Sequence, residues 1–212
     1  MNGQIEINLQ KKVLFLGAIP KNKLPLKVYA EFAMIQMVRE QGISRDFYNV
    51  YYDFSITYEG LLRRANIVKP NIIHFSLHGS KTKGLYFVDE FNFESESLVN
   101  LIEFDRIISA ITEKIKIEGI IISACNSYDF GKIAAKYVDY AIVMNDFIAD
   151  EAAIRFSRTF WATIFDEQNY DIETAVRYGR LALTRINFTD ANGNTINYDN
   201  IPKLIRKDKD DY

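Results

Sequence analysis

The sequence Gly119-Ile-Ile-Ile-Ser-Ala-Cys-Asn-Ser127 decides the expected fold, because it joins an apolar run to a short polar turn. Three consecutive isoleucines are typical of a strand that is buried on both faces of a parallel sheet. The turn carries Cys125, the only cysteine of the chain. Catalytic groups of parallel sheets lie just beyond the carboxyl ends of the strands. We therefore expect this thiol at the position of a nucleophile.

Along the rest of the chain, short runs typical of strands alternate with segments in which apolar residues recur at helical spacing. Strands are expected at residues 12–16, 47–54, 70–78, 120–123 and 140–144. Helices are expected at residues 26–41, 57–66, 96–112 and 130–137, and from N-caps at Asp150 and Asp171, with a hairpin at 84–94 and a turn at Asn192-Gly193. This alternation predicts an α/β fold, with a mostly parallel central sheet covered on both faces.

The composition indicates one domain that spans residues 1–212. Hydrophobic residues make up 48% of the 212 positions, which is enough for a sizeable core. The run from Arg206 to Asp211 is mixed in charge, so a flexible tail is expected from about residue 203. The formal net charge of -2 argues against direct binding of nucleic acid, which requires clustered Lys and Arg.

The cysteine count and the hydropathy pattern bear on the cellular location. A single cysteine excludes an internal disulfide framework. The sequence shows no basic, apolar leader and no apolar run near the roughly 18 residues of a spanning helix. We therefore expect a cytoplasmic protein that does not enter a membrane, in a reducing compartment where a free thiol persists.

His78-Gly79 ends the expected strand before the one that leads to Cys125. The two residues His78 and Cys125 are 125 − 78 = 47 positions apart, which leaves room for a hairpin and a crossover helix. If the two strands are neighbours, both side chains meet at one edge of the sheet. An imidazole could then activate the thiol, and the N–H groups of Gly79 and Cys125 could form an oxyanion hole.

Less specific interpretations of these residues remain open. A free cysteine is more often a small buried hydrophobic residue, and a histidine is more often a hydrogen-bonded structural group. The positions of His78 and Cys125 at strand ends, followed by small or polar residues, favour the catalytic interpretation.

Two sequence motifs resemble the paired motifs of the CHAT family of caspase-like cysteine peptidases. These are His74-Phe-Ser-Leu-His-Gly-Ser80 and Ile121-Ile-Ser-Ala-Cys-Asn-Ser127, and the likeness extends over roughly residues 11–187. Many members of that family have Gly where this chain has Leu77 directly before the histidine.

The resemblance implies a caspase-like three-layer α/β/α sandwich and an endopeptidase that acts on protein substrates without a cofactor. It assigns His78 as general base, Cys125 as nucleophile and Gly79 to the oxyanion hole. Bacterial relatives commonly act in defence or programmed cell death. Control by a regulatory or sensor protein is expected as well.

Several further polar residues are weaker candidates. His74 shares a strand face with His78, so it is either a second-shell group that orients His78 or a satisfied core histidine. A metal site is disfavoured, because no third ligand has suitable spacing. Asp146 or Asp150 could line a pocket that prefers a basic residue, although Asp150 is more simply explained as an N-cap. Ser127 and Asp129 are either pocket wall or ordinary loop.

Two other functions were compared with the peptidase. The first is a catalytically weak or inactive caspase-fold module that signals or acts as a scaffold, and the intact His, Gly and Cys set argues against it. The second is a nucleotide-binding α/β domain. It is disfavoured because Gly17-Ala-Ile-Pro20 lacks the glycine spacing of a phosphate-binding loop.

Overall fold

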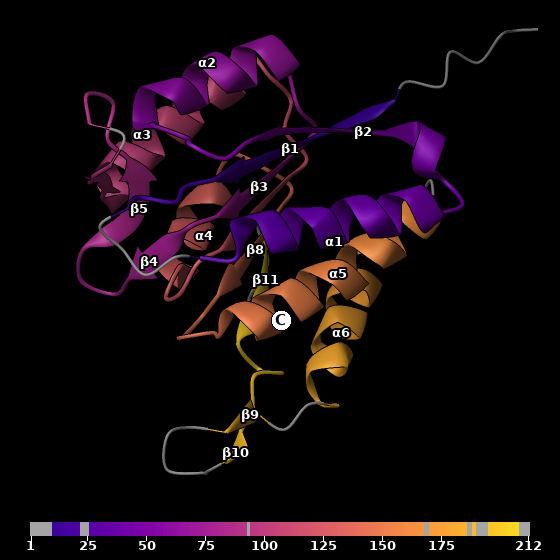
Figure 1. Cartoon of the computed structure of the whole chain (residues 1–212). Coiled ribbons are helices and arrows are strands. Elements are labelled where there is room, and N and C mark those ends of the chain that lie inside the picture. The colour runs from indigo at the N-terminus through magenta and orange to yellow at the C-terminus, as the bar shows by residue number, and fades with distance from the viewer. Residues whose placement is uncertain are drawn as a thin grey trace, which may run out of the picture.

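The computed structural model describes residues 10–21, 26–92, 94–167, 170–185, 188–189 and 195–207. Its centre is a six-stranded sheet in the order β11-β8-β7-β3-β1-β2 (Figure 1). Five strands are parallel and β11 is antiparallel to β8. The strands are β1 (Lys11–Gly17), β2 (Tyr48–Asp53), β3 (Ile72–Ser76), β7 (Gly119–Ser123), β8 (Tyr140–Met144) and β11 (Pro202–Arg206).

Helices cover both faces of this sheet. They are α1 (Val28–Gln41), α2 (Tyr58–Val68), α3 (Leu101–Thr112), α4 (Tyr128–Ala134), α5 (Asp150–Asp166) and α6 (Ile172–Leu183), with a 3-10 turn η1 (Arg45–Phe47). Helices α1, α5 and α6 pack on one face and α2, α3 and α4 on the other (Figure 1). The predicted three-layer α/β/α sandwich with a mostly parallel sheet is confirmed.

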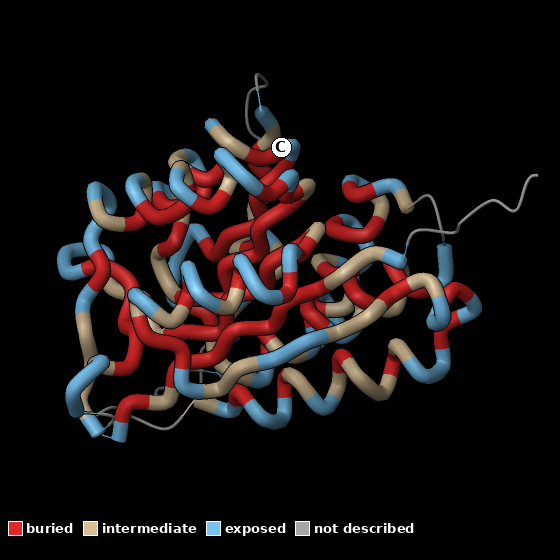
Figure 2. The backbone as a smooth tube through the Cα atoms, turned by 90° about the horizontal axis from the view of Figure 1, so that it is seen from above, coloured by how far each residue is buried: buried red, intermediate tan, exposed pale blue. Residues whose placement is uncertain are grey.

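The triple isoleucine of β7 explains why both faces must be covered. Ile120 and Ile122 join the core beneath α2, α3 and α4, whereas Ile121 joins the core beneath α1, α5 and α6. Successive side chains of a strand point to opposite faces, so a continuous apolar run needs a helical layer on each side. In Figure 2 the buried residues follow the central strands, and the helices alternate between buried and exposed.

A smaller antiparallel sheet, β4-β5-β6, extends beyond the end of β3. It contains β4 (His78–Ser80), β5 (Gly84–Val88) and β6 (Glu96–Val99). The helix expected over 96–112 was therefore wrong in its first turn, because residues 96–99 pair with β5. Helix α3 begins only after Asn100, whose side chain accepts from the N–H groups of Ile102 and Glu103 in a capping box.

The C-terminal part of the chain also differs from the expectation. The tail expected to be flexible from about residue 203 instead forms β11, which pairs with β8 and buries Leu204 and Ile205. β11 forms the edge of the sheet, where Leu204 joins the core beneath α1, α5 and α6 and Ile205 joins the core on the opposite face. Residues 208–212 and the turn expected at Asn192-Gly193 lie outside the described residues, and β9 (Phe188–Thr189) and β10 (Thr195–Ile196) form a short ribbon.

No helix within the described part of the chain is both long enough and apolar enough to cross a bilayer.

Candidate active site

The strands that precede His78 and Cys125 are direct neighbours. Ser76 of β3 pairs with Ser123 of β7, and the N–H of Leu77 donates to the carbonyl of Ser123 at 3.2 Å. The ends of β3 and β7 are thereby held side by side. This is the arrangement that a joint site of His78 and Cys125 requires.

Gly79 lies directly against the backbone of Cys125. A Cβ atom on Gly79 would overlap the carbonyl oxygen of Cys125 and press on the Cβ of Ala124. Only glycine therefore fits between β4 and the turn after β7, because any side chain would push the two segments apart. This contact brings together the two backbone segments from which the oxyanion hole was expected.

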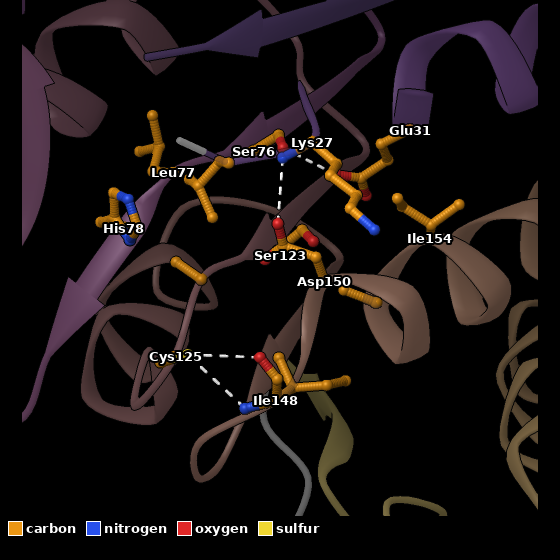
Figure 3. A pocket seen from close by; sticks show the side chains of 13 residues that line it. Lys27, Glu31, Ser76, Leu77, His78, Ser123, Cys125, Ile148, Asp150 and Ile154 are labelled. Carbon is orange, nitrogen blue, oxygen red and sulfur yellow. Dashed lines mark hydrogen bonds between the residues drawn. The ribbon is translucent and has the colours of Figure 1, made fainter. Parts of the chain in front are cut away.

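His78 and Cys125 line one pocket of about 40 Å³ at this edge of the sheet (Figure 3). The start of α1, the ends of β3 and β7, and the first turns of α5 supply the rest of its wall. Its lining is mainly apolar, but it includes the carboxylates of Glu31 and Asp150. The pocket therefore combines a thiol, an imidazole, two acids and one lysine, Lys27.

The thiol of Cys125 is partly buried and is hydrogen-bonded to the backbone. Sγ lies 3.5 Å from the nitrogen of Ile148, which donates to it, and 3.7 Å from the oxygen of Ile148, which accepts from it (Figure 3). Burial raises the pKa of Cys125, the bond from Ile148 lowers it, and the charges of Asp150 and Asp146 raise it further, so that the net shift is upward. This arrangement favours the protonated form of the thiol.

The imidazole of His78 lies on β4, where it is half-buried opposite Tyr86 of β5. The two rings meet edge to face, with centroids 6.4 Å apart. This contact holds the ring from one side and leaves it in the wall of the pocket that Cys125 shares.

His74 is fully buried within β3 and bonds to groups other than His78. The indole Nε1–H of Trp161 donates to its Nδ1 at 3.1 Å, and its Nε2 lies 3.1 Å from Oε1 of Glu31. Because Nδ1 accepts, the ring proton resides on Nε2 and is donated to the carboxylate. The second-shell role expected for His74 is therefore not what the structure shows, since both ring nitrogens are used elsewhere. Its environment is that of a satisfied core histidine.

Glu31 is a buried carboxylate that the sequence analysis missed. The hydroxyls of Ser76 and Ser157 each donate to it at 2.6 Å, in addition to His74. Burial acts to raise the pKa of Glu31, but the hydrogen bonds from His74, Ser157 and Ser76 outweigh it and lower the pKa. A signal existed in the sequence, because Glu31 occupies an inward position of α1 among Val28, Ile35 and Val38.

The acids expected near a substrate pocket have different surroundings. Asp150 is the first residue of α5 and not its N-cap, which is Ala149; its carboxylate accepts from the N–H of Lys27 at 3.0 Å and lines the pocket. Asp171, in contrast, caps α6 as predicted. Asp146 is exposed and its carboxylate accepts from the N–H of Phe147.

Ser127 and Asp129 do not line the pocket that contains His78 and Cys125. Ser127 is fully buried: its hydroxyl donates to the carbonyl of Ile122 at 3.1 Å and accepts from the N–H of Met144 at 2.9 Å. It thus ties the end of β7 to β8. Asp129 pairs with Lys132 at 3.2 Å and lines a separate pocket.

Among the residues that the structure describes, no group of three or more His, Cys, Asp or Glu side chains is arranged to hold a metal ion.

Comparison with known proteins adds an independent observation. The chain is 32% identical over 204 residues to a "Roc-COR-CHAT protease" from an unknown prokaryotic organism, and 27% identical over 208 residues to a "Probable protease" from Gillisia limnaea. The chain is thus similar to part of two proteins that are named as proteases, one of them a CHAT protease. They cover 93% and 94% of this chain but only 19% and 36% of the two relatives. No family model matches the chain.

Proposed function

We propose that the chain is a caspase-like cysteine endopeptidase in which Cys125 is the nucleophile and His78 is the general base. The observation that carries this proposal is the shared pocket, where neighbouring parallel strands deliver a thiol and an imidazole to one wall. The names of the two protease relatives agree with it at the level of peptidase activity.

The proposed reaction uses the two strand ends in sequence. His78 takes the thiol proton as Sγ attacks the carbonyl carbon of the scissile peptide, and the N–H groups of Gly79 and Cys125 receive the oxyanion. The tetrahedral intermediate then collapses, the C–N bond breaks, and His78 returns the proton to the leaving amine. Water, deprotonated by His78, hydrolyses the resulting thioester and restores the thiol.

The carboxylates in the pocket suggest which type of substrate residue is preferred immediately before the cleaved bond. Asp150 and Glu31 both line the pocket that contains the thiol. Glu31 already accepts from three side chains, so Asp150 at the start of α5 is the acid available to a substrate cation. The proposed preference is for Lys or Arg, and it should weaken in Asp150→Asn.

The resting thiol supports a regulated enzyme. Sγ is bonded to the backbone of Ile148, and its pKa is raised chiefly by burial, so attack requires the 145–149 segment to release it. A regulatory or sensor protein that moves this segment would switch the enzyme on, in keeping with a role in bacterial defence or programmed cell death. Full peptidase activity of the purified chain without any added protein would contradict this part of the proposal.

The same observation favours a second candidate, a caspase-fold module that signals by contact and has little or no activity. A thiol held by Ile148 and protonated is what such a module would contain. The two candidates differ in whether Cys125 is needed for bond cleavage.

The test is cleavage of a synthetic peptide library that is randomised over three positions on each side of the cleaved bond. Wild-type chain should produce slow cleavage, Cys125→Ala should produce none, and Lys114→Ala should match the wild type, because Lys114 is exposed after α3. Cleavage that persists in Cys125→Ala would contradict the proposal, and absence of any cleavage by the wild type would favour the signalling module.

A further inference from the structure

A second pocket lies on the other side of the contact between Gly79 and Cys125. It has a volume of about 310 Å³ and is walled by residues 80–84 of the β4–β5 turn, the start of α3, and the first residues of α4. The first pocket lies beneath α1 and α5 instead. The two pockets are thus lined from helices that cover opposite faces of the central sheet.

The second pocket begins one residue beyond each expected catalytic segment. Ser80 follows Gly79 and Asn126 follows Cys125, and both line it. Asn126 has a left-handed backbone (φ 54°), and its N–H donates to the carbonyl of Asp146 at 3.3 Å. The turn after the thiol is therefore held in a defined shape that leads from one pocket to the other.

The chemistry of the second pocket combines apolar surface with positive charge. Leu101 and Ile102 on the first turn of α3 are 39% and 65% exposed. Lys81 and Lys83 are exposed on the facing turn. The one carboxylate among the lining residues, Asp129, is already paired with Lys132 outside the pocket. A ligand that carries an apolar group next to an acidic group would complement the apolar surface and the positive charge of this pocket.

We propose that the second pocket binds the part of the substrate that follows the cleaved bond, and that it prefers an apolar residue adjoining Asp or Glu. This inference rests on the proposed peptidase function. A peptide whose carbonyl carbon reaches Sγ places the preceding side chain in the first pocket, which both catalytic side chains line. The residues that follow the cleaved bond, each about 3.3 Å long when extended, then pass Gly79 and Asn126 and enter the second pocket.

The amide groups at the start of α3 do not supply the preference for acids. The side chain of Asn100 already accepts from the N–H groups of Ile102 and Glu103, and the carboxylate of Glu103 accepts from the N–H of Asn100. The lysines are therefore the groups that would select an acidic residue, and their charges can be reversed without touching the expected catalytic residues.

The experiment compares cleavage-site preferences of three proteins on the library randomised on both sides of the bond. The test variant is Lys81→Glu/Lys83→Glu. The control is Lys114→Glu/Lys116→Glu, which reverses two exposed lysines of the same spacing after α3. Wild type and control should enrich Asp or Glu over Lys in the two positions after the cleaved bond by roughly five-fold, as expected for a few exposed ion pairs. The test variant should lose or invert that ratio.

The readout separates this inference from the peptidase proposal. Preferences before the cleaved bond, and labelling of Cys125 by a peptidyl acyloxymethyl ketone that occupies only that side, should be the same in all three proteins. Cleavage that depends on Cys125 but shows equal acid enrichment in the test variant would overturn the inference alone, and would assign the pocket to another partner. Absence of any cleavage that depends on Cys125 would overturn both.

Discussion

His74 and His78 are four residues apart, yet their surroundings differ in almost every respect. His74 lies inside β3, is fully buried, and has both ring nitrogens bonded, to Trp161 and Glu31. His78 begins the short strand β4 beyond the end of β3, is half-buried, and shares a pocket with Cys125. The histidine in the central sheet is part of the interior, whereas the one in the small sheet at its edge lies where a substrate can reach it.

The two histidines are expected to serve different purposes, His74 in stability and His78 in activity. The bonds around His74 join β3 to α1 and α5 through Glu31, Ser157 and Trp161, so they stabilise the layers that form the first pocket. The imidazole of His78 takes no part in this network around Glu31 and lies in the wall of the pocket that Cys125 shares. Variants at the two positions should therefore separate activity from stability.

The largest effect is expected for His78→Ala on peptide cleavage. Loss of a general base typically lowers the rate by about 10²–10⁴-fold, so kcat/KM should fall by that order. The thermal unfolding temperature should stay close to that of the wild type, because the ring is only half-buried. Cleavage of a library peptide and a thermal melt on the same preparations check both statements. An unchanged kcat/KM would remove His78 from the base role.

The next effect is expected for Glu31→Ala on the free energy of unfolding. Removal of this carboxylate leaves three buried donors without their acceptor. Each unsatisfied buried donor typically costs about 1–3 kcal/mol, so the total loss should be about 3 kcal/mol or more. Glu40→Ala on the same helix is the control, because Glu40 is exposed and forms a surface ion pair with Arg39; it should change stability by less than about 1 kcal/mol. Urea denaturation measures both.

The ionisation of Glu31 also predicts the sign of a pH effect. Its pKa is lowered in the folded chain, so its charge contributes stability above the ordinary carboxyl pKa, and this stability is lost as the pH falls. Part of the acid destabilisation should disappear in Glu31→Gln. Identical acid profiles for the two proteins would contradict an ionised Glu31.

A smaller effect is expected for Ser127→Ala. The N–H of Met144 would lose its buried acceptor, which costs about 1–3 kcal/mol. The loss should appear in urea denaturation. A neutral substitution would show that Ser127 does not tie β7 to β8 in the way described.

The smallest effect concerns the pH dependence of thiol alkylation. Because burial raises the pKa of Cys125, iodoacetamide should react with the folded chain at a midpoint above that of the same chain in urea. The single cysteine makes the modified mass unambiguous. A folded midpoint below the unfolded one would instead indicate a preformed thiolate–imidazolium pair.

The sequence predicted those parts of the molecule whose pattern is local. The strands at residues 120–123 and 140–144 were found because an uninterrupted apolar run can be buried only between two layers. The adjacency of β3 and β7 entered the sequence analysis only as a condition for a joint site, and the structure shows that the condition is met. These strands alone were enough to bring His78 and Cys125 to one edge.

The missed features depend on partners that are distant in sequence. β6 and β11 are strands because they pair with β5 and β8, and their own residues do not reveal these partners. Glu31 bonds to Ser157 across 126 positions. Its inward place on α1 was visible, but the groups that satisfy its charge were not.

The most direct test of the division between the two histidines is the labelling of Cys125 by a peptidyl acyloxymethyl ketone, followed by intact-protein mass spectrometry. The proposed dyad predicts one added label on the wild type, carried by Cys125, and a much slower reaction for His78→Ala at equal folded concentration. Equal labelling rates for the two proteins would contradict the assignment of His78 as the base and of the shared pocket as the active site.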